Sequence, residues 1–130
     1  MVALATMTFA VLLFIPYKRF KAGLKGQVSA DDFKFGESTN VPSDVSIPNR
    51  NLMNLLEMPV LFYVACLTLY VTKNVDAMLL VLAWIYFALR AAHSLVHLTY
   101  NRVRHRLIVY AASNVVLAMI WIRLFQALTK

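Results

Sequence analysis

The stretch Asn49–Pro59, NRNLMNLLEMP, leads directly into the apolar run VLFYVACLTLYV at 60–71. Three of its polar side chains, Arg50, Asn54 and Glu57, are four and three residues apart, a spacing that puts them on one face of an α-helix. An ionisable side chain inside a membrane span costs free energy, and it almost always faces other helices rather than lipid. The stretch therefore predicts a span with one polar face that meets a partner inside a helical bundle.

The composition of the whole chain agrees with a membrane location. Hydrophobic residues make up 61% of the 130 residues, mean hydropathy is +0.66, and only 15% of residues are charged. A soluble domain is typically about 45–50% apolar, so these residues could not all be buried under a water-soluble surface. We expect one integral membrane domain over residues 1–130.

Four apolar segments are long enough to cross a bilayer as helices, because backbone groups in lipid must bond within their own segment. The fold class predicted is an all-α integral membrane protein with a bundle of four transmembrane helices. The first segment lacks the basic start and the cleavage site of a signal peptide, so it is interpreted as a retained span. A polar loop rich in Gly, Ser, Asp and Pro is expected at 18–50. The predicted spans cover about residues 1–17, 52–72, 77–100 and 107–128.

Basic residues cluster in the first loop and in the third connection, NRVRHR at 101–106. With four spans these two connections lie on the same side of the membrane. The positive-inside rule then predicts cytoplasmic basic loops and termini outside. The net charge of +7 is explained by this orientation in the membrane, and no nucleic-acid partner is expected.

The third predicted span carries a second polar stripe, Arg90, His93 and His97, spaced three and four residues apart on one helical face. We expect Glu57 and Arg90 to form a buried ion pair. Such a pair alone would serve to fix helix register. The additional cations nearby favour a polar cavity for an anionic ligand.

The two histidines are also spaced to hold a metal ion or a haem. Glu57 is the only carboxylate expected near them and no cysteine joins them, so no metal is expected. Pro59 lacks a backbone N–H and predicts a bend that frees the carbonyl of Leu55, close to Asn54 and Glu57.

The patterns R-x-x-x-N-x-x-E at the start of the second of four spans and R-x-x-H-x-x-x-H in the third resemble the MAPEG family, the membrane-associated proteins in eicosanoid and glutathione metabolism. The resemblance extends over the whole chain in topology. It implies a homotrimer that binds glutathione, as a co-substrate, in a cytoplasm-facing cleft between subunits.

The resemblance also implies a role for each polar position. Arg50, Asn54 and Glu57 match the motif that holds glutathione on one subunit, and Arg90, His93 and His97 match the facing stripe. Arg106, with Tyr110 one turn later, matches the arginine proposed to stabilise the glutathione thiolate. Arg102 is the other candidate for that role.

The function implied is a glutathione-dependent transferase or peroxidase, related to microsomal glutathione transferases, which acts on lipophilic electrophiles or hydroperoxides in the membrane. His97 stands where the eicosanoid-forming members usually carry a tyrosine, and Pro59 follows the glutamate unusually closely. These departures suggest a divergent bacterial member in the inner membrane. The alternatives are a non-catalytic protein of the same fold that binds a thiol or lipid, a small transporter that uses Glu57 and Arg90, and a haem or metal protein.

Overall fold

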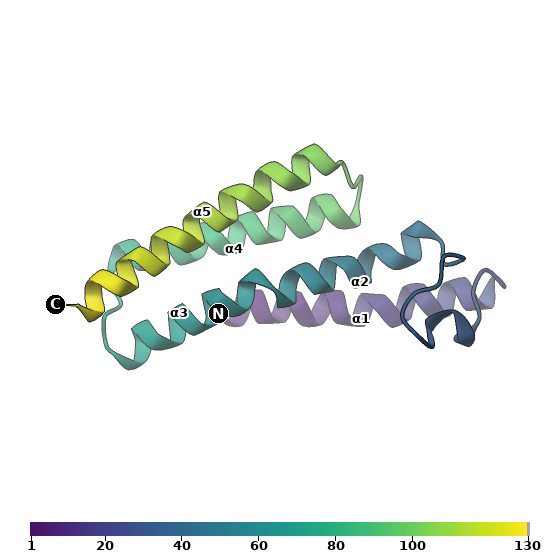
Figure 1. Cartoon of the computed structure of the whole chain (residues 1–130), viewed down its shortest axis with the longest axis horizontal. Coiled ribbons are helices and arrows are strands. Elements are labelled where there is room, and N and C mark those ends of the chain that lie inside the picture. Colours follow the sequence, from purple (N-terminus) through teal and green to yellow (C-terminus); the bar gives the residue numbers. More distant parts are fainter. Residues whose placement is uncertain (130) are drawn as a thin grey trace.

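A computed structural model describes residues 1–129, which form helices joined by short connections and contain no β-strand (Figure 1). The predicted fold class, an all-α chain with four membrane-spanning segments, is confirmed. The elements are α1 (Val2–Leu24), the 3₁₀ helix η1 (Ala30–Phe33), α2 (Ser43–Leu56), α3 (Met58–Val71), α4 (Ala77–Leu98) and α5 (Val103–Leu128).

Four segments are long and apolar enough to cross a bilayer, because α2 and α3 follow each other as one span of 29 residues. The helices extend beyond the predicted spans at the first connection. α1 continues to Leu24, and α2 already begins at Ser43, so the irregular connection is 25–42 rather than 18–50. The sequence KRFKAGL at 18–24 continues the helix. The chain leaves it only at Gly26, whose φ of 67° places it in the left-handed region just past the helix end.

The second span is interrupted at Glu57, where φ is −89° and ψ is −97°, outside the helical range. Pro59 is the second residue of α3, and without an N–H it cannot donate to the carbonyl of Leu55. The bend predicted from Pro59 is therefore present. It divides the span into α2, which carries the polar motif, and α3, which is apolar.

The helices pack as two antiparallel pairs, α1 beside α2 and α4 beside α5, and α3 continues from α2 to pack against α5 (Figure 1). Their shared core includes Leu4 of α1, Leu55 of α2, Phe62 of α3, Tyr86 of α4 and Leu117 of α5. The rings of Phe62 and Tyr86 stack with their centres 4.6 Å apart. Between helices in lipid such close packing is the main attraction, because lipid tails are as apolar as the side chains.

The two ends of the bundle differ in charge. One end, called the basic end below, holds the connections 25–42 and 99–102. At the other end Asp76 caps α4 by accepting the Leu79 N–H at 2.7 Å, and it pairs with Arg123 of α5 at 2.5 Å. The Leu79 N–H and the Arg123 guanidinium both favour the carboxylate, so the pKa of Asp76 lies below its ordinary value.

Candidate functional site

The polar stripe of α4 lies inside the bundle. Arg90, His93 and His97 are 0%, 2% and 1% exposed, and Tyr86 continues the same face one turn earlier at 0%. α4 occupies the middle of the fold, in contact with α1, α2 and α5, so its inner face is covered from several sides. The i, i+3, i+7 spacing thus produces a buried row of donors that points away from lipid.

Arg90 satisfies a backbone group that the helix break leaves free. Its Nη2 donates to the carbonyl of Asn54, one of the last carbonyls of α2, which have no partner within their own helix. The guanidinium carbon also lies 5.5 Å from the centre of the Tyr110 ring. Nε and Nη1 of Arg90 have no hydrogen-bond partner among the described residues.

The predicted ion pair between Glu57 and Arg90 is wrong within this chain. Glu57 is exposed and forms no salt bridge with any residue of 1–129. The prediction assumed one continuous helical face, whereas the interruption at Glu57 moves this side chain off the face that meets α4. The other two motif residues also stay on α2: Arg50 is exposed, and half-buried Asn54 donates to the Arg50 carbonyl at 2.9 Å.

The two buried histidines are close to each other and to α5. The rings of His93 and His97 meet edge to face with centres 5.9 Å apart, and the His93 ring centre is 5.7 Å from that of Tyr110. Nδ1 of His93 and both ring nitrogens of His97 lack a hydrogen-bond partner in residues 1–129. This part of the stripe therefore has unused capacity to donate or accept hydrogen bonds.

Two candidate arginines at the start of α5 have different surroundings. Arg106 is half-buried, its Nη1 donates to the Asn101 side-chain oxygen at 2.7 Å, and its Nε is a buried donor with no described partner. Arg102 is exposed at the N-cap of α5. Asn101 adopts φ of 47°, which asparagine tolerates better than most residues, and its N–H bonds to the Val96 carbonyl. Of the two, Arg106 is the one held beside the buried stripe.

Sequence reasoning missed three buried polar residues of this region. Ser94 donates to the side-chain oxygen of Asn51 at 3.2 Å, which links α4 to α2, and the hydroxyl of Tyr86 is buried without a described partner. Tyr86 was detectable, since it precedes Arg90 by four residues and so belongs to the same helical face. Asn51 and Ser94 gave no such signal, because isolated small polar residues in a span are usually read as neutral.

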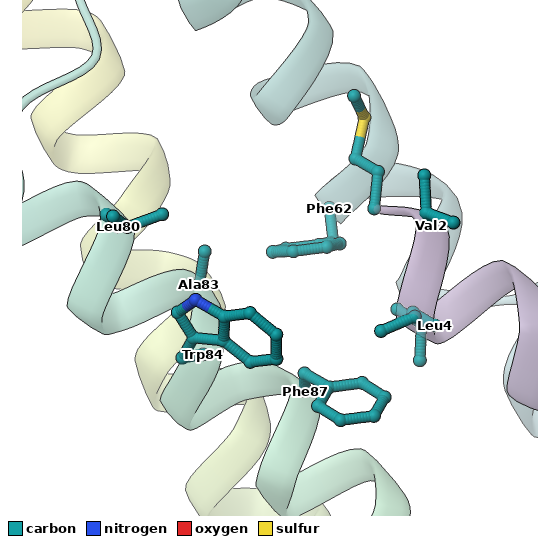
Figure 2. A pocket seen from close by; sticks show the side chains of 9 residues that line it. Val2, Leu4, Phe62, Leu80, Ala83, Trp84 and Phe87 are labelled. Carbon is teal, nitrogen blue, oxygen red and sulfur yellow. The ribbon is translucent and has the colours of Figure 1, made fainter.

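The cavities described within one chain are lined by residues other than those of the predicted site. A cavity of about 310 Å³ lies where the start of α1 meets α3 and α4, and apolar side chains line it (Figure 2). Trp84 and Phe87 of α4 point into it together with Phe62 and Leu4, as Figure 2 shows. None of the cavities described for residues 1–129 is lined by the arginines or histidines of the predicted site.

Comparison with protein families gives a match over nearly the whole chain. The family model described as "MAPEG family" matches residues 1–126. A search of curated proteins and a search of solved structures gave no match. The matched range includes the first three spans, all but the last two residues of the fourth, and every polar residue described above.

Proposed function

This chain belongs to the MAPEG family and is an integral membrane protein, and from that premise we propose that it is a glutathione-dependent transferase or peroxidase. Its second substrate would be a lipophilic electrophile or hydroperoxide dissolved in the bilayer. A membrane protein suits this chemistry because the lipophilic second substrate is already concentrated in the bilayer around it.

The observation that carries the proposal is the position of Glu57. This carboxylate is exposed about 21 Å along the helix from Val71, within a span whose neighbouring exposed side chains are apolar. A carboxylate at such depth rarely faces lipid. We therefore propose that this face packs against another copy of the chain in a homotrimer. The exposed apolar neighbours are Met53, Leu56, Val60 and Leu61.

The buried donors near the basic end supply the second half of the argument. Arg90, His97 and Arg106 retain nitrogen atoms without partners in residues 1–129, and all lie towards the end where Arg50 is exposed. Glutathione carries two carboxylates and two amides, which are suitable acceptors for such donors. In the proposed assembly it lies between subunits, held by the α2 motif of one and the α4 stripe of the next.

The chemistry follows from a cation near the thiol. A free thiol has a pKa near about 8.5, and a guanidinium beside it favours the thiolate, which is the nucleophile. Arg106 is assigned this role because Asn101 fixes its side chain at the start of α5. The thiolate attacks the electrophilic carbon, a C–S bond forms, and the leaving group departs with its electron pair.

The proposal is tested first by binding. Purified full-length protein in detergent is titrated with glutathione in a calorimeter, with glutathione disulfide as a control for non-specific binding of the peptide. Saturable binding of glutathione is expected, together with conjugate formation from 1-chloro-2,4-dinitrobenzene. Absence of binding would overturn the proposal, and binding without turnover across several electrophiles and hydroperoxides would favour the non-catalytic alternative.

The assembly is tested separately by the mass of the detergent-solubilised particle. A mass of three chains is expected. A single chain with Glu57 still in the bilayer would remove the observation on which the proposal depends.

A further inference from the structure

A groove at the basic end is separate from the candidate site. It has a volume of about 430 Å³ and lies between the last turns of α1 and the segment that contains η1. Gly23 contributes bare backbone to its wall, where even an added Cβ would meet only the Val28 carbonyl, at 4.0 Å. The remaining wall is mostly apolar and includes Phe20, Leu24, Ala30 and Phe33 together with one cation, Arg19.

The walls of the groove are held in place by specific contacts. Arg19 stacks on the Phe33 ring at 4.3 Å and pairs with Glu37 at 3.1 Å, which ties η1 to α1. A small second core of Ala22, Val41 and Val45 closes the connection from the other side. The groove is therefore a formed feature of the connection 25–42.

Exposed apolar side chains lie close to basic ones in the last turns of α1 and in the segment after η1. Phe20, Leu24 and Phe35 are 74%, 92% and 94% exposed. Lys21 lies 5.9 Å from the Tyr17 ring, and Lys34 lies 5.5 Å from the Phe35 ring. Aromatic rings beside lysines, at the end of a membrane span, are typical of side chains at the headgroup level of a bilayer.

We propose that this groove binds an anionic phospholipid of the leaflet at the basic end. An acyl chain lies against Phe20, Leu24 and Phe33, and the phosphate accepts from Arg19. Nε of Arg19 is a buried donor with no partner among the described residues, so the guanidinium has a hydrogen bond left to give even while it holds Glu37. Lys21 and Lys34, which follow the groove residues Phe20 and Phe33 in the chain, add attraction for an anionic headgroup.

Charge favours a lipid over a second copy of the chain as the occupant. Residues 18–37 contain five lysines and arginines against three aspartates and glutamates. Two such segments face to face would bring like net charges together, whereas an anionic lipid neutralises the excess. The inference does not depend on the proposed glutathione chemistry.

The test counts lipids on the full-length protein by native mass spectrometry. Delipidated protein is incubated with phosphatidylglycerol or with phosphatidylcholine of the same acyl chains. Phosphatidylglycerol is expected to be retained in preference, and Arg19→Gln should weaken its retention about fivefold, the effect of one cation near a headgroup. Equal retention of the two lipids by the parent protein would overturn the proposal.

Three further variants separate the groove from general charge and from loop folding. Ala30→Trp fills the groove without removing a charge and should also lose the lipid; unchanged retention, or a change in oligomer mass instead, would overturn the proposal. Arg104→Gln removes an exposed cation elsewhere at the same end, and this variant should retain the lipid.

Glu37→Gln breaks the ion pair with Arg19 but leaves the guanidinium free, so retention of the lipid should persist. A loss equal to that of Arg19→Gln would show that the ion pair, not the phosphate contact, matters.

Discussion

The polar residues of the first connection and those of α4 have opposite surroundings. In the connection, the Asp32 carboxylate accepts from the Ser29 N–H at 2.8 Å, the Ser29 hydroxyl at 3.1 Å and the Ser38 hydroxyl at 2.7 Å. Inside the bundle, Arg90 has one acceptor, and both ring nitrogens of His97 have none in residues 1–129.

This difference is the reverse of what stability alone would select. An unpaired donor costs little in water and a great deal in a low-dielectric interior. A well-bonded carboxylate in the connection beside several unpaired donors in the interior indicates that the interior donors serve a ligand, ordered water or another subunit. Substitutions in both regions can test whether the interior donors serve function and the hydrogen bonds of the connection serve structure.

The largest expected effect is on the conjugation rate at the two candidate arginines. Arg106→Ala should lower the rate about a hundredfold, because a preorganised donor to a developing or stabilised anion is typically worth that much. Arg102→Ala, which removes an exposed guanidinium at the N-cap of α5, is the matched control and should leave most of the rate. Both rates are measured with glutathione and 1-chloro-2,4-dinitrobenzene on detergent-solubilised protein.

A pH profile distinguishes an effect on the thiolate from a loss of folded protein. If Arg106 stabilises the thiolate, the rate of Arg106→Ala should recover as the pH rises towards the ordinary pKa of a thiol, about 8.5. A uniformly low rate at every pH would contradict that role. A larger loss in Arg102→Ala than in Arg106→Ala would transfer the assignment to Arg102.

The next largest effect is expected at Arg90, whose replacement should weaken glutathione binding without lowering thermal stability. Arg90→Met should weaken glutathione binding by about tenfold to a hundredfold, the value of a charge-assisted hydrogen bond. Removing the donor to the Asn54 carbonyl costs about 1–3 kcal/mol, but a buried guanidinium without a carboxylate carries a desolvation penalty of about several kcal/mol. The thermal stability of Arg90→Met should therefore be unchanged or higher.

Arg104→Met is the control for Arg90→Met, because it makes the same replacement at an exposed position. It should change neither binding nor stability appreciably. A strong fall in the melting temperature of Arg90→Met would show that Arg90 has a counter-ion in the assembled protein, and the contrast between the connection and the interior would then hold only for the single chain.

A smaller effect is expected where two polar side chains of the interior bond to each other. Ser94→Ala removes the hydrogen bond to Asn51 and should destabilise the protein by about 0.5–2 kcal/mol, the range for such bonds between membrane helices. Thr68→Ala, which loses a bond to the Val64 carbonyl of its own helix, should cost less. Unfolding in a denaturing detergent measures both, and equal losses would mean that the α2 to α4 link adds nothing specific.

The sequence predicted four apolar spanning helices because their signal is local and strong. Runs of about 20 apolar residues with few charges admit only one conformation in lipid, and Pro59 marked the bend for the same reason, since a missing N–H acts at its own position. The spacing of Arg90, His93 and His97 likewise predicted one inward face. Each of these features depends on residues within a single helix.

The sequence failed where the answer depended on the direction of a broken helix. Arg50, Asn54 and Glu57 share a face only if the helix is continuous, and the backbone at Glu57 is not helical. The same bend that was expected from Pro59 therefore separated Glu57 from Arg90. The stretch 18–50 was expected to be mostly loop from its Gly, Ser, Asp and Pro content. The contacts that order part of it could not be predicted, because pairs such as Arg19 with Glu37 join residues 18 apart in the chain.

The smallest effect is expected at Asp32, on local order and not on the bundle. Its three hydrogen bonds, led by the Ser29 N–H, hold the pKa of this carboxyl below its ordinary value. A lowered pKa stabilises the connection above the unfolded value of about 3.9, and that stability is lost as the pH falls through the folded pKa. Acidification to about pH 3 should thus lower the hydrogen-exchange protection factors of residues 25–42, taken relative to the intrinsic exchange rates at that pH, and leave those of α4 unchanged.

Two neighbouring carboxylates separate this local effect from a general response to acid. Asp32→Asn should show the faster exchange already at neutral pH. Asp31→Asn, which alters an exposed carboxylate with no side-chain hydrogen bond among the described residues, should not. If α4 lost protection together with the connection, the two regions would unfold as one cooperative unit. The connection could then not be treated as structurally independent of the interior.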